Sequence, residues 1–417
     1  MENKWNRIKL KDAIQFNPRE TIKKGNIAKK VAMEKLEPFN RKISGYEEVA
    51  FTSGTKFRNG DTLLARITPC LENGKTAQVD ILDKDEIGFG STEYIVLREK
   101  LGITDNDFIY YLAISPEFRN IAIKSMNGSS GRQRVQKDIL ENSEIYLPDL
   151  KEQKAIAKIL SDLDEKIEIN NKINDNLEKI AQAIFKQWFV DFEFPNENGE
   201  PYKSSGGDMI ESELGEIPKG WEVKELQEIT SNITRGQTPK YEEYSKIKVL
   251  NQKVNKGKVL EKQYFKYLKQ DMEISKEKYA YQWDILINSL GQGTLGRVHL
   301  YKEKTNDVVI DQHITIIRTG YKGLAFYLYN LLDSSKYKGV LEGLISGSTG
   351  MLMLNISKIR ELKVIKPSEK ILSNFESILI NLYKNISNNI IQNERLINTR
   401  DALLPKLMSG EIRVPLD

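Results

Sequence analysis

An internal duplication extends over most of this 417-residue chain. The ten residues that begin at Trp5 (WNRIKLKDAI) are repeated from Trp221 (WEVKELQEIT), at an offset of 216 positions. The segment 128–148 is repeated at 347–367, at an offset of 219 and without a gap. A period of this length exceeds the roughly 20–50 residues of solenoid repeats and indicates a duplicated domain. Two similar modules on one chain predict that two similar ligands are bound at once.

The basic residues are distributed in the same way in both copies. Residues 19–42 contain eight Lys or Arg and three Glu, and residues 235–258 contain seven Lys or Arg and two Glu, so each window carries a charge of +5. The whole chain has a net charge of only +4. A single lysine-rich window is ordinarily solvated surface. The matched placement favours an anionic partner that both modules share.

The composition is that of a globular protein. Hydrophobic residues make up 39% and charged residues 29% of the chain, which is enough apolar material for a packed core. The sequence has no apolar run of about 18 residues and begins without the apolar core of a signal peptide, so we expect a cytoplasmic protein with no membrane partner. One cysteine, Cys70, and two histidines, His299 and His313, exclude an intramolecular disulfide and a Cys/His zinc site.

Each copy begins with short β-branched segments separated by Gly, Asn and Pro, a pattern typical of strands and turns. The predicted strands lie at 61–67, 76–82 and 93–98 in the first copy and at 284–288, 296–301 and 308–318 in the second. A helix is predicted after them in each copy, at 107–114 and 324–332. Each module is therefore predicted to be a mixed α+β domain.

After Pro148 the apolar pattern changes to a helical period. Asp149 precedes Glu152 by three positions, which is the spacing of a capping box. Residues at alternating spacings of four and three then form a seam along a helix of about 40 residues, roughly 60 Å long. The seam comprises Ile156, Leu160, Leu163, Ile167, Asn170, Asn174, Leu177, Ala181 and Ile184. Displaced by 219 positions, it recurs as Phe375, Leu379, Leu382, Ile386, Asn389, Asn393, Leu396, Arg400 and Leu403.

Both seams carry asparagine at the same two central steps, Asn170 and Asn174 in one helix and Asn389 and Asn393 in the other. Polar pairs at the centre of a seam set the register of two helices, so mutual packing is favoured over two separate core helices. In an antiparallel pair the four asparagines face one another and the chain termini come together. In a parallel pair the exposed linker that we expect at 191–220 would have to retrace the helices.

The sequence therefore predicts two similar α+β modules joined by two long helices that pack as an antiparallel coiled coil with pseudo-two-fold symmetry. The predicted segments are a first module at 1–148, a central helical spacer at 149–192, a linker and second module at 193–367, and a distal helical spacer with a C-terminal tail at 368–417.

No sequence motif supplies a catalytic site. The segment 291–296 matches a dinucleotide-binding fingerprint, but a predicted strand follows it in place of the required helix, so a hairpin turn is expected. The segment 73–76 lacks the earlier glycine of a phosphate-binding loop and is likewise expected to be a turn. Motifs of amino-methyltransferases, zinc metallopeptidases and serine hydrolases are absent. We therefore expect neither catalytic residues nor a metal or cofactor site in this chain.

Two glycine-serine loops, at 127–135 and 346–354, are the strongest candidates for binding. Their backbone and hydroxyl donors can approach phosphates, and the Arg-Gln-Arg run at 132–134 can read guanine or adenine edges. The structural alternative is a tight turn before the last strand. The second copy has Met-Leu-Met at 351–353 where the first has Arg-Gln-Arg, so the modules are expected to read different sequences.

The chain resembles the specificity subunits of type I restriction-modification systems over essentially its whole length. The resemblance rests on LPDLKEQKAIAKIL at 147–160, AIFKQWF at 183–189, GEIPKGW at 215–221 and LLPKLMSG at 403–410. The chain departs from this pattern at the second long helix. There Ile371 and Leu372 stand in place of the Glu152-Gln153 pair, and capping is left to Ser368.

This resemblance implies a non-catalytic DNA-binding subunit. Its modules would be target recognition domains that each read one half of a bipartite asymmetric site in double-stranded DNA. Two methylation subunits would bind the helical spacer, and restriction and translocation subunits would join through the assembled complex. S-adenosylmethionine, ATP and Mg²⁺ would belong to those partners, which would flip the target adenines. The alternative is a scaffold with two protein-binding modules on a coiled coil, which predicts no salt-dependent DNA binding.

The candidate DNA contacts are residues of the charged windows, the turns and the glycine-serine loops. In the first module they are Lys23, Lys24, Lys29, Lys30, Arg41, Lys42, Lys75, Ser129, Ser130, Arg132, Gln133 and Arg134. In the second module they are Arg235, Gln237, Lys240, Lys253, Lys256, Gln292, Thr294, Arg297, Ser348 and Thr349.

Overall fold

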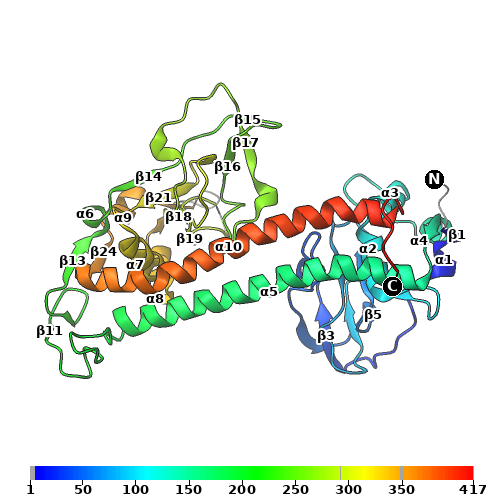
Figure 1. Cartoon of the computed structure of the whole chain (residues 1–417), viewed down its shortest axis with the longest axis horizontal. Helices are drawn as coiled ribbons and strands as arrows, with labels where there is room; N and C mark the ends of the chain where they lie inside the picture. Colours follow the sequence, from blue (N-terminus) through cyan, green and yellow to red (C-terminus); the bar gives the residue numbers. More distant parts are fainter. Residues whose placement is uncertain (1–4, 292, 348–351, 417) are drawn as a thin grey trace. The chain divides into compact units, whose positions relative to one another are not determined.

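The computed structural model describes residues 5–291, 293–347 and 352–416. It divides into two compact units. Unit 1 comprises Met1–Asn170 and Gln392–Asp417, and unit 2 comprises Asn171–Ile391. The two longest helices, α5 (Leu150–Phe189) and α10 (Glu369–Met408), each contribute one half to each unit (Figure 1). The units therefore divide the chain differently from the four predicted segments.

Unit 1 contains two four-stranded sheets. The antiparallel sheet has the order β2 (Ile14–Phe16), β9 (Tyr94–Glu99), β6 (Thr62–Ala65), β7 (Thr76–Gln78). The second sheet, in which β3 and β8 are parallel, has the order β4 (Glu47–Ala50), β3 (Ile27–Val31), β8 (Gly88–Gly90), β5 (Thr55–Phe57). A further pair joins β1 (Asn6–Lys9) to β10 (Glu144–Leu147). The helices are α1 (Leu10–Ala13), α2 (Asn106–Ile114), α3 (Pro116–Lys124) and α4 (Lys137–Asn142), with a 3-10 turn at Met33–Lys35.

Unit 2 also contains two four-stranded sheets. The antiparallel sheet has the order β14 (Asn232–Arg235), β21 (Ile314–Arg318), β18 (Ile285–Asn288), β19 (Val298–Leu300). The second sheet has the order β15 (Tyr241–Glu242), β17 (Lys266–Leu268), β16 (Lys248–Leu250), β20 (Val308–Ile310). Three short pairs join β13 (Glu222–Glu225) to β24 (Lys363–Lys366), β11 (Met209–Ile210) to β12 (Ile217–Pro218), and β22 (Ile345–Ser346) to β23 (Met353–Leu354). The helices are α6 (Leu226–Ile229), α7 (Lys322–Asp333), α8 (Ser335–Gly343) and α9 (Ile356–Arg360), with 3-10 turns at Lys262–Tyr264 and Lys276–Lys278.

The two units repeat one topology. The antiparallel sheets have matching strand orders, and β4-β3-β8 corresponds to β17-β16-β20 with the parallel pair in the same place. The copies differ at the sheet edges, where β5 lies beside β8 in unit 1 and β15 lies beside β17 in unit 2. Equivalent ion pairs, Arg98–Asp61 and Arg318–Asp284, are held at 2.6 Å in both. The duplication of sequence is a duplication of fold, and the predicted α+β class is confirmed.

One predicted strand was wrong in extent. We expected a single strand at 308–318, but the chain forms β20 and β21, which belong to different sheets. Between them Asp311 Oδ1 accepts a hydrogen bond from the backbone N–H of His313 at 2.9 Å, which closes a turn. The β-branched pattern continues on both sides of this turn, so it does not mark the change of sheet.

Most residues of the segment 191–220 are exposed, as expected for a linker, but a few buried residues attach it to unit 2. Phe192, Phe194 and Ile217 are buried, and the ring of Phe194 stacks on Trp221 at a centroid distance of 5.1 Å. The segment also contains the β11–β12 hairpin. Its Gly, Ser and Glu content predicted solvent exposure, but a few aromatic residues bury enough apolar area to hold the segment on unit 2.

The helices α5 and α10 run antiparallel within each unit. In unit 1, Asp164 pairs with Arg400 and Asn170 pairs with Asn393. In unit 2, Asn174 pairs with Asn389, and the rings of Trp188 and Phe375 lie 5.8 Å apart. Residue numbers rise along one helix as they fall along the other, which is the antiparallel arrangement predicted from the two seams. No seam residue on either helix is exposed.

The four central asparagines form two hydrogen-bonded pairs. In unit 1, Asn170 Nδ2 donates to Asn393 Oδ1 at 2.8 Å, and in unit 2, Asn389 Nδ2 donates to Asn174 Oδ1 at 2.8 Å. Asn170 is 1% exposed. A buried amide that is shifted off its partner loses a hydrogen bond without gaining one from water, so each pair favours a single register.

A buried carboxylate of α5 binds each globular module. In unit 1, Asp164 of α5 accepts from Arg400 Nη1 and from the Tyr111 hydroxyl, both at 2.7 Å. In unit 2, Glu178 of α5 lies 2.9 Å from Lys302 Nζ, and the Tyr329 hydroxyl donates to its other oxygen at 3.4 Å. Tyr111 and Tyr329 occupy corresponding helices, α2 and α7. Each module therefore contacts α5 through a tyrosine and a carboxylate, but the cation comes from a different element.

The start of α5 also binds the segments near both chain ends. Asp149 Oδ1 accepts from the backbone N–H of Glu152 at 2.8 Å, which confirms the predicted cap. The Glu152 carboxylate does not complete the box; it accepts from Trp5 Nε1 at 3.0 Å and from Arg413 Nε at 2.5 Å. Trp5 and Arg413 therefore meet at one carboxylate, in agreement with termini that come together.

Breaking the Asp164–Arg400 pair is expected to destabilise unit 1. The Arg400→Leu substitution leaves a buried carboxylate with a weaker set of partners, so the free energy of unfolding should fall by about 3–5 kcal/mol. The double variant Asp164→Leu/Arg400→Leu should recover part of this loss, because no unpaired charge remains. Urea titration of the full chain measures both changes.

The exposed Lys158–Asp162 pair on the same helix is the matched control. Lys158→Ala should change the free energy of unfolding by less than about 0.5 kcal/mol, because exposed ion pairs are solvated and screened. An equal fall in the free energy of unfolding in Lys158→Ala and Arg400→Leu would contradict the expectation that the buried pair contributes more to stability than the exposed pair.

Candidate nucleic-acid interface

The first glycine-serine loop is a closed turn that lies on a backbone frame. Asn127 and Arg134 exchange backbone hydrogen bonds of 3.0 and 2.9 Å, so the structural alternative of a tight turn is present. Behind it, the Val135 N–H donates to Arg66 O and the Arg66 N–H donates to Glu93 O, both at 2.9 Å. The loop is thus fixed to the end of β6 and to the chain that enters β9.

The side chains of this loop fall into two kinds. Ser129, Ser130 and Arg132 are exposed, and Arg132 has no side-chain partner among the described residues. Arg134 is held by Glu93, which accepts from Nε at 3.0 Å and from Nη2 at 2.7 Å. Hydrogen bonds from Arg134 lower the pKa of the Glu93 carboxyl, so the pair is ionised at neutral pH.

An exposed aromatic ring, that of Phe39, lies beside the β6–β7 connection. The ring is 44% exposed, and its backbone has a φ of 54°, which is uncommon outside glycine. Arg119 lies 4.9 Å from the ring centroid and donates to Leu71 O at 3.0 Å. A Cβ at Gly74 would come within 2.5 Å of the ring. Sequence reasoning missed this surface, because no local pattern places 39, 74 and 119 together.

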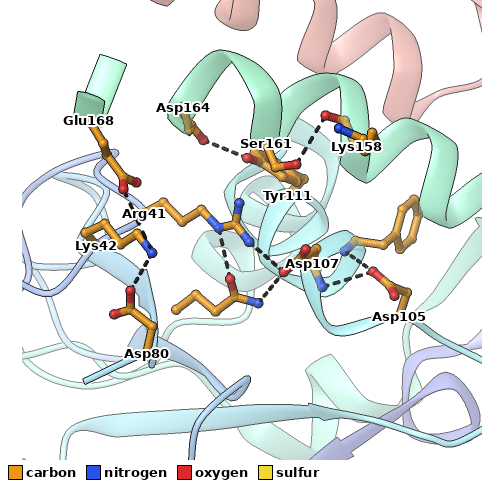
Figure 2. A network of polar contacts seen from close by, with 12 residues as sticks. Arg41, Lys42, Asp80, Asp105, Asp107, Tyr111, Lys158, Ser161, Asp164 and Glu168 are labelled. Carbon is orange, nitrogen blue, oxygen red and sulfur yellow. Dashed lines mark hydrogen bonds and ion pairs between the residues drawn. The ribbon is translucent and has the colours of Figure 1, made fainter. Parts of the chain in front are cut away.

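Several predicted DNA contacts of unit 1 are occupied within the protein. Arg41 is 9% exposed; its Nε donates to Gln78 Oε1 at 2.9 Å and its Nη2 donates to Asp107 Oδ1 at 2.6 Å (Figure 2). Lys29 is 7% exposed and pairs with Asp83 and with Glu86, each at 2.9 Å. Burial in ion pairs argues against direct DNA contacts by Arg41 and Lys29, because their donors are already used.

Figure 2 shows that this network joins the loop at 41–42 to two helices. Asp105 caps α2 by accepting from the Asp107 and Phe108 N–H groups at 3.1 Å. Lys42 bonds to Asp80 and lies 3.9 Å from Glu168 of α5. The basic residues at 41–42 therefore hold the module together, whereas a charge count treats every lysine and arginine alike.

The remaining predicted lysines of unit 1 differ in whether their side chains are free to contact DNA. Lys30 lies 3.8 Å from Glu47, and Lys75 Nζ donates to Met33 O at 2.9 Å. Lys23 and Lys24 are exposed in the segment before β3 and have no side-chain partner in the described ranges. Both side chains are therefore free to contact an anionic partner.

Unit 2 repeats the backbone frame. The Leu354 N–H donates to Ser289 O at 2.9 Å, and the Ser289 N–H donates to His313 O at 2.8 Å. Leu354, Ser289 and His313 correspond to Val135, Arg66 and Glu93 of unit 1. The segment 291–296 connects the antiparallel strands β18 and β19, as expected for a hairpin turn.

A pocket of about 340 Å³ opens beside this frame in unit 2. It lies where the parallel strands β16 and β20 end, and its lining includes Tyr241, Lys253, Tyr264, Lys266, Asp311 and His313. Lys266 Nζ lies 4.4 Å from the Tyr241 ring centroid. Two half-exposed tyrosines with adjacent lysines form a surface on which bases and phosphates can bind.

The predicted contacts of unit 2 differ in whether their side chains are already bound within the protein. Arg235 donates to Leu354 O, and burial lowers the pKa of its guanidinium. Lys256 pairs with Glu261 at 3.2 Å, and Arg297 Nη2 donates to Gly293 O at 3.1 Å. Gln237 donates to Glu273 O at 3.4 Å, and Thr294 donates to Gln252 Oε1 at 3.3 Å. Lys240 and Lys253 are exposed. Gln292, Ser348 and Thr349 lie outside the described residues.

Two other structural features are absent from the described part of the chain. No group of three or more His, Cys, Asp or Glu is arranged to hold a metal ion there. In the same residues, no helix combines the length and apolar character needed to cross a bilayer.

Burial of His299 in β19 predicts a pH dependence. The ring is 3% exposed, and desolvation lowers its pKa to about 3, although Nδ1 donates to Gly257 O at 2.5 Å. The unfolded chain takes up a proton near pH 6.5 and the folded chain does not. Stability is therefore complete above pH 6.5 and is lost as the pH falls towards 3.

We expect the free energy of unfolding of unit 2 to fall by about 2 kcal/mol between pH 7.5 and pH 5 on account of His299. Urea titrations at both pH values measure the loss. His299→Gln should remove it, whereas His313→Gln, which removes the only other histidine in the chain, should retain it. An unchanged pH dependence in His299→Gln would disprove this assignment.

Comparisons with known proteins agree on one kind of protein. A family model described as the type I restriction modification DNA specificity domain matches residues 2–179. The chain is 26% identical to the HindI specificity subunit of Haemophilus influenzae, over 89% of this chain and 90% of that protein. It is 32% identical to the MjaIX specificity subunit of Methanocaldococcus jannaschii, over 74% of this chain and 69% of that protein. The crystal structure of a type I restriction-modification S subunit from M. genitalium has a TM-score of 0.52 at 17% identity, over 98% of this chain and 97% of that chain.

Proposed function

Because the chain belongs to the specificity subunits of type I restriction enzymes, we propose that it reads a bipartite asymmetric DNA site, with one half-site bound by each unit. The observation that carries this proposal is the repeated backbone frame with different side chains on it. Arg66, Glu93 and Arg134 stand in unit 1 where Ser289, His313 and Met353 stand in unit 2. A shared frame gives both units the same approach to DNA, and different side chains give different base contacts.

The proposed partners are two methylation subunits and, through the assembled complex, restriction and translocation subunits. The surfaces available to them on α5 include Ile159, Ile169, Ile173 and Ile180, which are 37–50% exposed. Exposed isoleucines on a helix otherwise covered by charged residues are a feature of protein interfaces. We assign catalysis, S-adenosylmethionine, ATP and Mg²⁺ to those partners, which would also flip the target adenine.

The test is adenine methylation across a genome with and without this chain. Co-expression with its methylation subunits should produce methylated adenines in one motif of two defined half-sites separated by a fixed spacer. A motif with a single half-site, or methylation that does not depend on this chain, would refute the bipartite role. Complexes that form without salt-dependent DNA binding would support the scaffold alternative.

The exposed lysines of the first charged window should contribute phosphate contacts. In Lys23→Ala/Lys24→Ala, we expect weaker binding to all DNA sequences alike and a salt-dependence slope smaller by up to about 2 in log–log units, because one counterion is released per phosphate contact. Fluorescence anisotropy between about 50 and 200 mM salt measures the slope.

Arg41→Ala is the matched control for these lysines. Arg41 carries the same charge in the same window but is buried in ion pairs. Its removal should lower the stability of unit 1 and leave the slope of the remaining folded protein unchanged. A smaller slope in Arg41→Ala, with no change in Lys23→Ala/Lys24→Ala, would reverse the assignment.

A further inference from the structure

We infer that Arg134, oriented by Glu93, reads a guanine in the half-site of unit 1, and that the equivalent position of unit 2 reads a different base. This inference rests on the proposed function and deepens it, because it assigns one base contact to named residues.

The two positions are equivalent in the backbone as well as in the sequence. Ser91 Oγ accepts from the Glu93 N–H at 3.1 Å, and Asp311 Oδ1 accepts from the His313 N–H at 2.9 Å. The carbonyl of Glu93 or His313 then binds the residue after β6 or β18, as described above. Side chains at 93 and 313 therefore leave the frame from the same kind of turn, and a difference in their chemistry acts at the same place in each unit.

The Arg134–Glu93 geometry leaves a guanidinium edge available. Glu93 accepts from Nε and from one hydrogen of Nη2, which leaves two hydrogens on Nη1 and one on Nη2. Nη1 has no hydrogen-bond partner in the described chain, and the Arg134 side chain is 44% exposed. Two parallel N–H groups match guanine O6 and N7 in the major groove, and no other base offers two acceptors there.

A purely structural role accounts less well for this pair. Exposed ion pairs add little to stability, because solvation and side-chain entropy offset the attraction. The turn is already closed by backbone hydrogen bonds between Asn127 and Arg134. What Glu93 adds is orientation, since contact at two atoms fixes the plane of the guanidinium. Glu93 is thus a positioning residue for Arg134.

Arg132 of the same loop is the natural contrast. It is exposed and lacks a side-chain partner among the described residues, so its orientation is free. A mobile guanidinium binds phosphate of any sequence but does not select a base edge.

Unit 2 has no oriented guanidinium at this position. His313 Nδ1 lies 2.9 Å from Asp311 Oδ2, so the ring presents a single nitrogen, Nε2, towards the pocket. Met353, at the position of Arg134, is 38% exposed and has no hydrogen-bond donor in its side chain. This pair does not provide the two parallel donors that guanine requires, which makes the two half-sites different.

The experiment compares methylation motifs of the full complex, assembled with its methylation subunits, for four variants of the chain. Arg134→Gln and Glu93→Gln should each lose the guanine preference at one base pair of one half-site, by about ten-fold or more, while the other half-site stays intact. Arg132→Gln should weaken binding to all sequences and keep the motif. The transplant His313→Glu/Met353→Arg should introduce a guanine preference in the other half-site.

The outcomes separate this inference from the function on which it rests. If the wild-type complex yields no bipartite motif, the proposed function fails. If it yields one and Arg134→Gln leaves every base preference unchanged, only the guanine assignment is overturned. If Glu93→Gln keeps the motif while Arg134→Gln changes it, the positioning role of Glu93 is overturned. Retained salt-dependent binding to non-specific DNA shows that each variant is folded.

Discussion

The register of α5 against α10 is the constraint on which the rest of the structure depends. In each unit one asparagine pair, Asn170–Asn393 or Asn174–Asn389, lies within the helix seam. A leucine seam alone tolerates displacement by one turn, whereas a buried amide that loses its partner costs about 1–3 kcal/mol. The asparagines therefore select one alignment at some cost in apolar burial. The contacts between the two helices, such as Asp164–Arg400, follow from that alignment.

The modules contact the helices through buried charge. Unit 1 combines Asp164, Arg400 and Tyr111, and unit 2 combines Glu178, Lys302 and Tyr329. Such pairs add little net stability compared with apolar residues, but they are costly to break. A displaced module would separate Lys302 from Glu178 in unit 2, and would remove the Tyr111 hydroxyl from Asp164 in unit 1. This penalty suits a protein whose proposed role is to present two recognition surfaces on defined supports.

The duplication conserves backbone and varies side chains. The same three-segment frame underlies both candidate interfaces, yet it carries a paired arginine in unit 1 and a histidine with a methionine in unit 2. Around it the sheet edges differ as well, since β15 lies beside β17 in unit 2 and β5 lies beside β8 in unit 1. An asymmetric DNA site is thus compatible with a duplicated protein fold.

The sequence by itself determined the duplication, the α+β class, both long helices and their antiparallel partnership, because these rest on periodicity and on repeats that need no tertiary information. Local patterns also placed the glycine-serine turn and the hairpin at 291–296.

Only the tertiary structure decided which charged side chains are free to contact a partner. Lys23 and Arg41 are equivalent in a charge count, but Arg41 is buried against Gln78 and Asp107, which lie far away along the chain. The same reason explains Phe39 and Glu93: their roles depend on residues such as Arg119 and Arg134, which folding brings near and sequence spacing does not reveal.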